Sequence, residues 1–336
     1  MLRRVTAAAF LFGTSIIPVA SAATSAGWEV AKIEGRDYVS VDSMKRFYSF
    51  TKLTRAGNSI TLENAKLVVN LKVGGNECLM NGVKFVFTHP VTNIGDKSYV
   101  SRMDLAKLID PVLRPSFIKN AGEFRTVILD PGHGGKDPGA TNSLGTEASY
   151  NYKVAEKTKA LLTQKGFKVI MTRDSSTYLS LQERVNFANA VRENAIYISI
   201  HFNSGGRAAR GIETFTLSPP GVSHYGRGLI AADNHARIGN EHDSANIALA
   251  TAVHGKILRH LGKNTFDRGI KRARFSVLSG VKHPAILLEG GFMTHPYEAR
   301  LIDNEAYRNQ IAVSILEAVE KYRYAVGVKP VVKAPN

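Results

Sequence analysis

A short apolar run that ends in a glycine-rich loop constrains the fold of this chain more than any other stretch. Val127, Ile128 and Leu129 are followed by a polar loop, residues 130–140, which holds four glycines and His133. This pattern predicts a buried strand that leads into a loop at the edge of a sheet. In α/β folds ligands bind at such an edge, and glycines let a ligand approach the loop backbone closely.

The loop does not fit the phosphate-binding pattern, although it contains the pair Gly135-Lys136. Asp130 stands where that pattern needs its first glycine, and Asp137 follows the lysine in place of Ser or Thr. His133 is therefore the residue of chemical interest. Taken alone, a single histidine is more often structural or merely exposed than a ligand, so other stretches must support a functional role.

Strands and helices alternate from Arg125 to Tyr324, which predicts one α/β domain with a sheet core over residues 125–324. The spacing of Val154, Leu161 and Leu162 predicts a helix that stops at Gly166. The predicted strands are 125–130, 167–171, 196–200, 212–217 and 285–288, and the predicted helices are 147–166, 181–192, 246–261 and 305–324. Residues 325–336 are rich in Lys and Pro, and we expect a flexible tail.

Residues 28–115 predict a small α+β domain with an approximate internal repeat. Residues 35–40 and 95–101 each have the pattern of a turn, a short strand and a helix cap before a short helix. Alternating segments at 59–62, 66–73 and 84–87 predict further strands. The stretch weakly resembles the small domain at the N-terminus of copper amine oxidases, a resemblance that implies no copper site. It contains no catalytic cluster, so we expect a wall-binding or spacer role that adds nothing to the chemistry, followed by a linker at 116–124.

The first 22 residues have the pattern of a signal peptide. Arg3 and Arg4 precede an apolar stretch, and Ala20-Ser21-Ala22 fits a cleavage site. The stretch is short for a membrane span, and no later stretch is long enough for one, so we expect export to a periplasm or cell wall. Cys78 is the only cysteine, which excludes an intramolecular disulfide and a zinc site built on cysteines.

The formal net charge of +16 favours an anionic partner, although exposed lysines can serve solubility alone. Nucleic acid is a poor candidate, because an exported protein rarely meets it. An anionic polymer of the cell wall is the better candidate.

Three further polar residues stand at the ends of predicted elements. His201 directly follows a predicted strand, Glu147 opens the helix after the His133 loop, and Glu289 ends another strand before two glycines. Two histidines and a carboxylate suit a catalytic zinc with an open position for water, and a further carboxylate could act as general base. Each acid also fits an ordinary role as a helix cap or a solvated strand end. The HExxH motif of one class of metalloprotease is absent.

Several segments together resemble one enzyme family, the zinc-dependent N-acetylmuramoyl-L-alanine amidases of the type-3 amidase family. The resemblance runs from about Arg125 to Tyr324 and rests on residues 127–140, 199–203, 211–215, 268–271 and 288–292. It implies a mixed sheet flanked by helices, zinc ligands His133, Glu147 and His201, and a catalytic glutamate at Glu289. It further implies cleavage of the amide between N-acetylmuramic acid and the L-alanine of the stem peptide in peptidoglycan.

Two other features follow from the comparison with that family. Some members carry an inhibitory helix where this chain has the tract Ser218–Asp243, but the tract is short and weakly periodic, so we do not expect that kind of regulation.

Asp130, beside the His133 loop, could orient a metal ligand without binding the metal itself, or could simply cap the loop. Two alternatives share the same residues: another exported zinc peptidase, and an inactive wall-binding protein. Any protein activator is left open.

Overall fold

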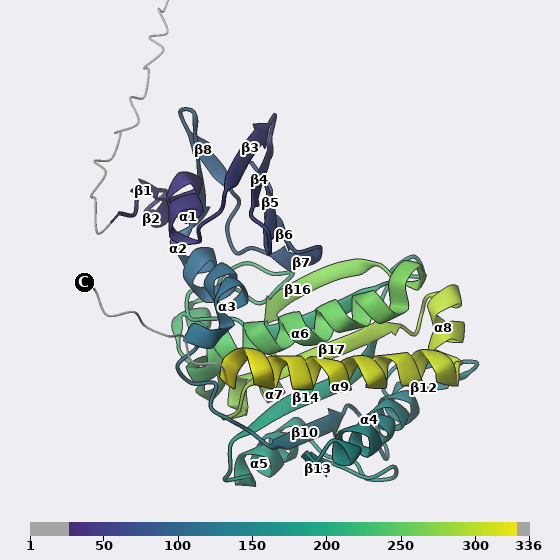
Figure 1. The fold of residues 1–336 in the computed structure, drawn as a ribbon. Coiled ribbons are helices and arrows are strands. Elements are labelled where there is room, and N and C mark those ends of the chain that lie inside the picture. Colours follow the sequence, from purple (N-terminus) through teal and green to yellow (C-terminus); the bar gives the residue numbers. More distant parts are fainter. Residues whose placement is uncertain (1–26, 328–336) are drawn as a thin grey trace, which may run out of the picture.

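The computed structural model describes residues 27–327. The signal peptide predicted at residues 1–22 lies outside them, as do residues 328–336 of the predicted tail. Figure 1 shows a small N-terminal part standing on a larger α/β part, whose long helices lie across one face of its sheet. Among residues 27–327, no helix combines the length and the apolar character needed to cross a bilayer.

The larger part is built on six strands in the order β13-β10-β14-β17-β15-β16. Neighbouring strands are parallel, except that β15 and β17 run antiparallel. The mixed sheet flanked by helices is therefore confirmed. The strands are β10 (Thr126–Pro131), β13 (Lys168–Met171), β14 (Ala195–Asn203), β15 (Ile212–Leu217), β16 (Asp267–Ala273) and β17 (Ala285–Phe292).

Helices cover both faces of this sheet. The long helices α4 (Glu147–Gln164), α6 (Asp243–Leu261) and α9 (Glu305–Gly327) share one core with the side chains of one face. The shorter α5 (Leu181–Ala190) and α7 (Ser276–Gly280) pack on the other face. Successive residues of a strand point to opposite faces, so Val127 and Leu129 join the first core and Ile128 joins the second. Burial on both sides explains the continuous apolar runs.

The N-terminal part contains both halves of the predicted repeat. Ser40 caps α1 after β2, and Ser101 caps α2 after β9; each serine hydroxyl accepts a hydrogen bond from the backbone amide three residues later. One sheet has the order β1-β2-β9-β8. Its strands and the following helices are β1 (Val30–Ile33), β2 (Arg36–Ser40), β8 (Thr92–Ile94), β9 (Lys97–Ser101), α1 (Val41–Phe47), α2 (Arg102–Asp104), a π-helical turn (Leu105–Ile109) and α3 (Asp110–Leu113).

The remaining strands of the small part continue the large sheet. An antiparallel meander, β3 (Lys52–Ala56), β4 (Ser59–Glu63), β5 (Val68–Lys72), β6 (Glu77–Met80) and β7 (Val83–Val86), ends beside β16. The pair Phe85 and Ile270 joins β7 to β16 in parallel, so one sheet of 11 strands crosses the junction. A shared apolar core also crosses it. The sequence did not predict this continuity.

The segment expected to be a linker is packed against the larger part. A short 3-10 helix covers Pro115–Phe117, and the buried ring of Phe124 lies 6.3 Å from the ring of Phe167 and 5.7 Å from that of Tyr322. Helix α9 also runs on to Gly327, past the start of the expected tail. The sequence missed strands β1, β3, β6, β8 and β16, the short pair β11 (Thr141–Asn142) and β12 (Gly145–Thr146), and helices α7 and α8 (Pro296–Asp303).

Candidate metal centre and cleft

The His133 loop begins where β10 ends. Gly134 and Asp137 exchange two backbone hydrogen bonds of 2.8 and 3.0 Å, which close a tight turn, and His133 has a positive φ of 60°. A Cβ atom on Gly132 would lie 2.0 Å from Cε1 of His201. Glycine at that position therefore makes room for the second histidine to approach the loop.

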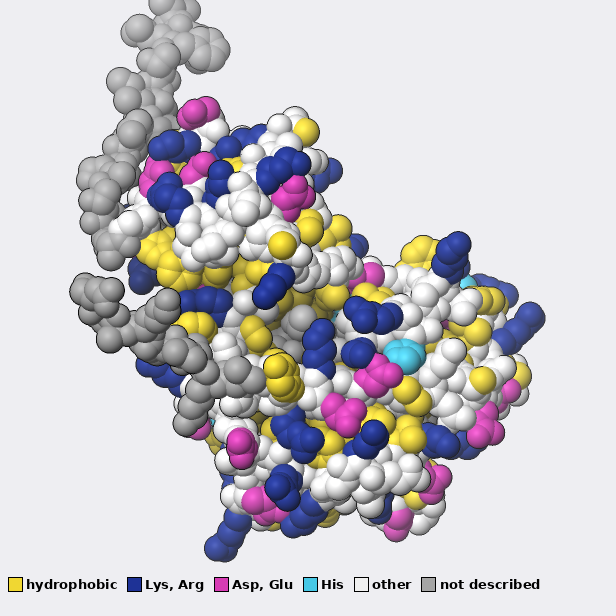
Figure 2. Space-filling model, viewed as in Figure 1, with side chains coloured by type: hydrophobic (Ala, Val, Ile, Leu, Met, Phe, Trp, Pro, Cys, Tyr) yellow, Lys and Arg dark blue, Asp and Glu magenta, His cyan; other side chains and the backbone are white. Residues whose placement is uncertain are grey.

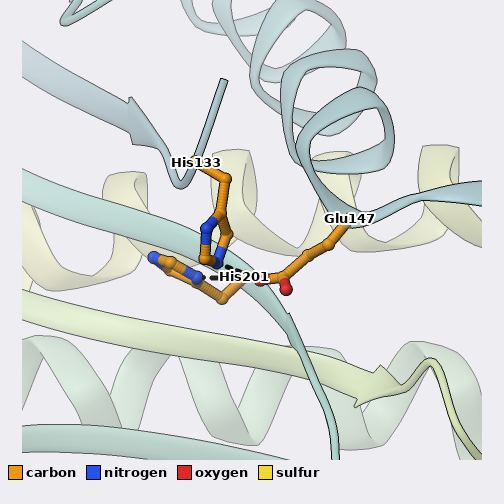
Figure 3. A group of neighbouring side chains, drawn as sticks. All are labelled: His133, Glu147 and His201. Atoms are coloured by element: carbon orange, nitrogen blue, oxygen red, sulfur yellow. Dashed lines mark hydrogen bonds and ion pairs between the residues drawn. The ribbon is translucent and has the colours of Figure 1, made fainter. Parts of the chain in front are cut away.

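Three of the residues singled out in the sequence meet beside this loop. Oε1 of Glu147 lies 3.2 Å from Nε2 of His133 and 2.9 Å from Nδ1 of His201 (Figure 3). The three side chains offer ligand atoms that all lie within 4.8 Å of one another. Two imidazoles and a carboxylate at this spacing form a donor set suited to a divalent transition metal.

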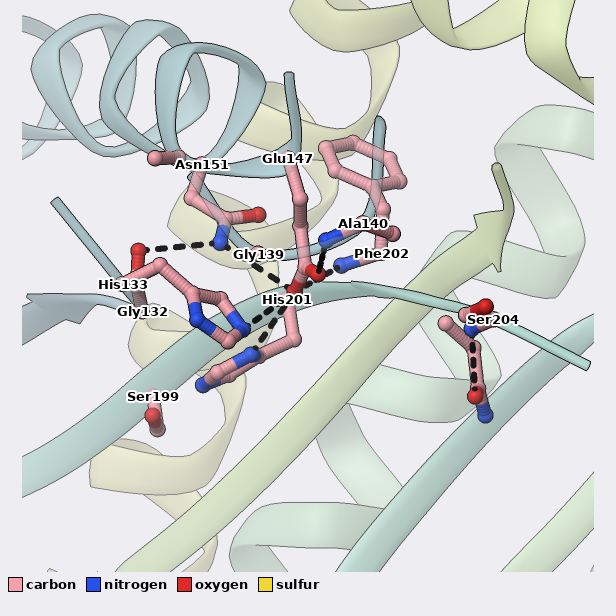
Figure 4. Close-up of polar contacts among 12 residues, drawn as sticks. Gly132, His133, Gly139, Ala140, Glu147, Asn151, Ser199, His201, Phe202 and Ser204 are labelled. Carbon is pink, nitrogen blue, oxygen red and sulfur yellow. Dashed lines mark hydrogen bonds and ion pairs between the residues drawn. The ribbon is translucent and has the colours of Figure 1, made fainter. Parts of the chain in front are cut away.

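The backbone holds the Glu147 carboxylate in place. Its Oε2 accepts a hydrogen bond of 2.9 Å from the amide of Ala140, and its Oε1 accepts one of 3.3 Å from the amide of Phe202 (Figure 4). Burial opposes ionisation, but the hydrogen bonds to His133 and His201 outweigh it and hold the pKa of Glu147 below its ordinary value. The carboxylate is thus ready to bind a cation.

A second carboxylate, that of Asp137, contacts the ring nitrogen of His133 that faces away from Glu147. Nδ1 of His133 lies 2.8 Å from Oδ2 of Asp137, which leaves Nε2 directed toward Glu147. A carboxylate at the far nitrogen fixes the tautomer of a metal-binding histidine. The hydrogen bond to Glu147, aided by Asp137, raises the pKa of His133.

Two roles were expected for Asp130, orienting a metal ligand or capping the loop, and its hydrogen bonds fit the second. Asp130 is fully buried and accepts hydrogen bonds of 2.6 Å from both Thr172 and Arg184. Burial alone would raise its pKa, but the charge of Arg184 and the hydrogen bonds from Thr172 and Arg184 act together to lower it. The same Arg184 donates a hydrogen bond of 2.6 Å to the carbonyl of His133. Asp130 therefore stabilises the loop backbone through Arg184.

Replacement of Asp137 by Asn is expected to weaken the binding of a divalent metal at this cluster by about 10–100-fold, because it removes the negative charge beside Nδ1 of His133. Titration of zinc against a competing chromophoric chelator measures this. The matched control is Asp42→Asn, which alters an acid paired with Arg55 in the small part and should leave zinc affinity unchanged. Equal affinities in both variants would show that the loop alone orients His133.

Glu289 lies next to this centre on the neighbouring strand. In the register of the sheet it stands opposite His201 on β14 and opposite Glu213 on β15. Among residues 27–327, its buried Oε2 has no hydrogen-bond partner. Burial, together with the charges of Glu147 and Glu213, raises the pKa of Glu289 well above its ordinary value, and a more basic carboxylate accepts a proton more readily.

A cleft of about 410 Å³ opens over these groups. His133, His201 and Glu289 line it, as do the starts of α5 and α7 through Leu181 and Ser276. A cleft of this volume can bury part of a ligand beside the three candidate metal ligands.

The tract Ser218–Asp243 passes nearby, with the His224 ring 5.2 Å from the ring of Phe275 in the cleft wall. Within the tract, helical residues before α6 are limited to two 3-10 turns, Ala231–Asn234 and Ile238–His242.

Residues 127–321 match the sequence model of a known family, described as N-acetylmuramoyl-L-alanine amidase. The chain belongs to this family. The amidase AmiC of Neisseria meningitidis is 32% identical over 240 residues, which cover 65% of this chain and 57% of that protein. The amidase LytC of Bacillus subtilis is 30% identical over 205 residues, 61% of this chain and 37% of that protein. The chain thus spans only part of the length of these relatives.

Solved amidase structures were also found to be similar to this chain. One from Clostridium difficile 630 is 33% identical, with a TM-score of 0.49, and covers 60% of this chain and 97% of that one.

Several residues of the site were not singled out by sequence reasoning. Asp137 lies in the loop already under study, and Asn151, one helical turn after Glu147, donates a hydrogen bond of 3.1 Å to the carbonyl of Gly132. Glu213 and Lys271 lie within segments that carried the family resemblance. Their proximity to Glu289 depends on strand order, which single-sequence patterns do not give.

Proposed function

We propose that this amidase is a zinc-dependent peptidoglycan hydrolase that cleaves the amide bond between N-acetylmuramic acid and the L-alanine of the stem peptide. The observation that carries the proposal is the convergence of His133, Glu147 and His201 within 4.8 Å, beside Glu289 and under a cleft, in a chain of the amidase family. The relatives named above are amidases by description.

In this proposal His133, Glu147 and His201 hold the metal. Zinc fits because two imidazoles and one carboxylate are a ligand set of catalytic zinc sites, which keep a further position open for water. When bound, zinc would supply Lewis acidity, which lowers the pKa of a coordinated water from 15.7 to about 7 and polarises a carbonyl.

Glu289 would move the proton. Its carboxylate lies beside the ligand histidine His201 and has a free oxygen among the described residues. It would accept a proton from the attacking water as the new C–O bond forms at the amide carbon. It would then give that proton to the alanine nitrogen as the C–N bond breaks, so that the base is regenerated.

The proposed substrate also fits the charge and the predicted export of the chain. Peptidoglycan stem peptides carry carboxylates, and the chain is strongly basic. Figure 2 shows Lys and Arg side chains spread over both parts of the molecule on the face in view. We propose that the protein works outside the cytoplasm, in a periplasm or cell wall.

Digestion of purified peptidoglycan tests the proposal. We expect new L-alanine amino termini and glycan strands without peptides, and we expect a metal chelator to abolish both and added zinc to restore them. New termini within the stem peptide would instead indicate a zinc peptidase. No cleavage by zinc-loaded protein would favour an inactive wall-binding protein.

A further inference from the structure

A buried carboxylate with two cationic partners lies directly beside Glu289. Glu213 is 4% exposed and stands opposite Glu289 in the register of β15 and β17. Its Oε2 lies 3.0 Å from Nζ of Lys271, and its Oε1 is paired with Nε of Arg268. The two cations offset the negative charge of Glu213, which would otherwise stand unpaired next to the carboxylate of Glu289.

Both cations belong to one strand, β16, and Lys271 is almost completely buried. Neither Glu213 nor Lys271 lines the cleft. These residues therefore act on Glu289 from the sheet, without touching the space open to substrate. The position of β16 decides whether Lys271 and Arg268 reach Glu213.

The outer side of β16 is held by the small N-terminal part. Arg272, next to Lys271, points to the opposite face of the sheet, where its Nη1 lies 3.0 Å from Oδ1 of Asp104 and 2.8 Å from Oγ1 of Thr88. Arg272 and Asp104 are both buried. At the start of the strand, Oδ2 of Asp267 accepts a hydrogen bond of 2.8 Å from the backbone amide of Lys84.

We propose that the small part belongs to the active-site framework: by fixing β16 through Arg272 and Asp267, it keeps Lys271 and Arg268 on Glu213 and so positions Glu289. The small part is then more than a wall-binding or spacer unit. Glu213, Lys271 and Arg272 are positioning residues, because none of them contacts the substrate cleft. The inference rests on the proposed role of Glu289 as the base.

Two substitutions of Lys271 test whether its contact with Glu213 positions Glu289. Both are made in the full-length zinc-loaded protein. With a small soluble muropeptide as substrate, Lys271→Met is expected to lower kcat by about 10–100-fold, the size of effect that a displaced catalytic group produces. KM should stay within about twofold, because the cleft is unchanged. Lys271→Arg, which keeps the charge, should recover most of the loss. Unchanged kcat in a folded Lys271→Met variant would overturn the inference.

Two substitutions at the junction test whether the contacts between Arg272 and the small part fix β16. Arg272→Met and the milder Thr88→Val should both lower kcat on the same muropeptide, with zinc content and KM retained. Hydrogen exchange of the β16 amides should become faster in both. The matched control, Lys256→Met, breaks a lysine–glutamate pair between α6 and α9 and should keep wild-type kcat.

The outcomes separate this inference from the proposed function. If Arg272→Met does not fold, Thr88→Val still tests the inference, because it removes only one hydroxyl. Wild-type kcat in Thr88→Val, together with faster hydrogen exchange of the β16 amides, would overturn the role of the small part. By contrast, wild-type cleavage by Glu289→Gln would overturn the proposed base itself, whatever the junction variants do.

Discussion

Replacement of Glu289 by Gln is expected to lower kcat for peptidoglycan cleavage by about 10²–10⁴-fold, the usual contribution of a general base. Gln keeps the size and the hydrogen-bonding capacity of the side chain but cannot take up a proton. The buried Oε2 of Glu289 has no partner among residues 27–327, so no other group of that region has to be rearranged. Steady-state kinetics on a soluble muropeptide, with zinc content and melting temperature measured in parallel, check the result.

A surface glutamate provides the control for this variant. Glu34→Gln removes an exposed carboxylate that pairs with Arg36 in the small part, and it should leave kcat unchanged. Near wild-type turnover by Glu289→Gln would mean that another residue is the base. Loss of zinc together with activity would make Glu289 a ligand and would require a new role for Glu147.

His201→Ala is expected to lose both the metal and the activity. The imidazole lies 2.9 Å from Glu147 and supplies one of only three side-chain ligands in the cluster, and a zinc site with two protein ligands binds far more weakly. Metal analysis after dialysis should show about one zinc per wild-type chain and much less in the variant. Added zinc should raise the melting temperature of the wild-type protein only, because a ligand stabilises the state that binds it.

An exposed histidine gives the matched control for the metal analysis. His235 is exposed in the tract before α6, and His235→Ala should retain zinc and activity. Full zinc occupancy in His201→Ala would contradict the ligand assignment.

The buried strands and long helices could be predicted because their own residues carry the pattern. Val127 to Leu129 and Ala285 to Leu288 are continuous apolar runs, and α4 has an apolar face. Polar residues at the ends of such strands pointed to His133, His201 and Glu289. Parallel strands bring their carboxyl ends to one edge of the sheet, so their approach to one another follows from the fold.

Strand β16 could not be predicted in this way, because four of its seven residues are charged, and two of these, Lys271 and Arg272, are buried. Arg272 forms an ion pair with Asp104, which lies 168 residues earlier, and Lys271 forms one with Glu213 on a neighbouring strand. Hydrophobic periodicity predicts which residues are buried, but it does not predict which residue far away in the sequence forms an ion pair with a buried charge. The same limit explains why the sequence left two roles open for Asp130 and why Asp137 was overlooked.

The sheet that crosses the junction also sets an order of events during synthesis. Lys84 on β7 donates its backbone hydrogen bond to Asp267 on β16, 183 residues later in the chain. Ribosomes add about 5–20 residues per second, so β16 is synthesised on the order of 10–40 s after β7. During that time the backbone edge of β7 is open to pairing with other chains. The strand is only four residues long and carries Lys84, and short, charged edges are the ones that resist such mispairing.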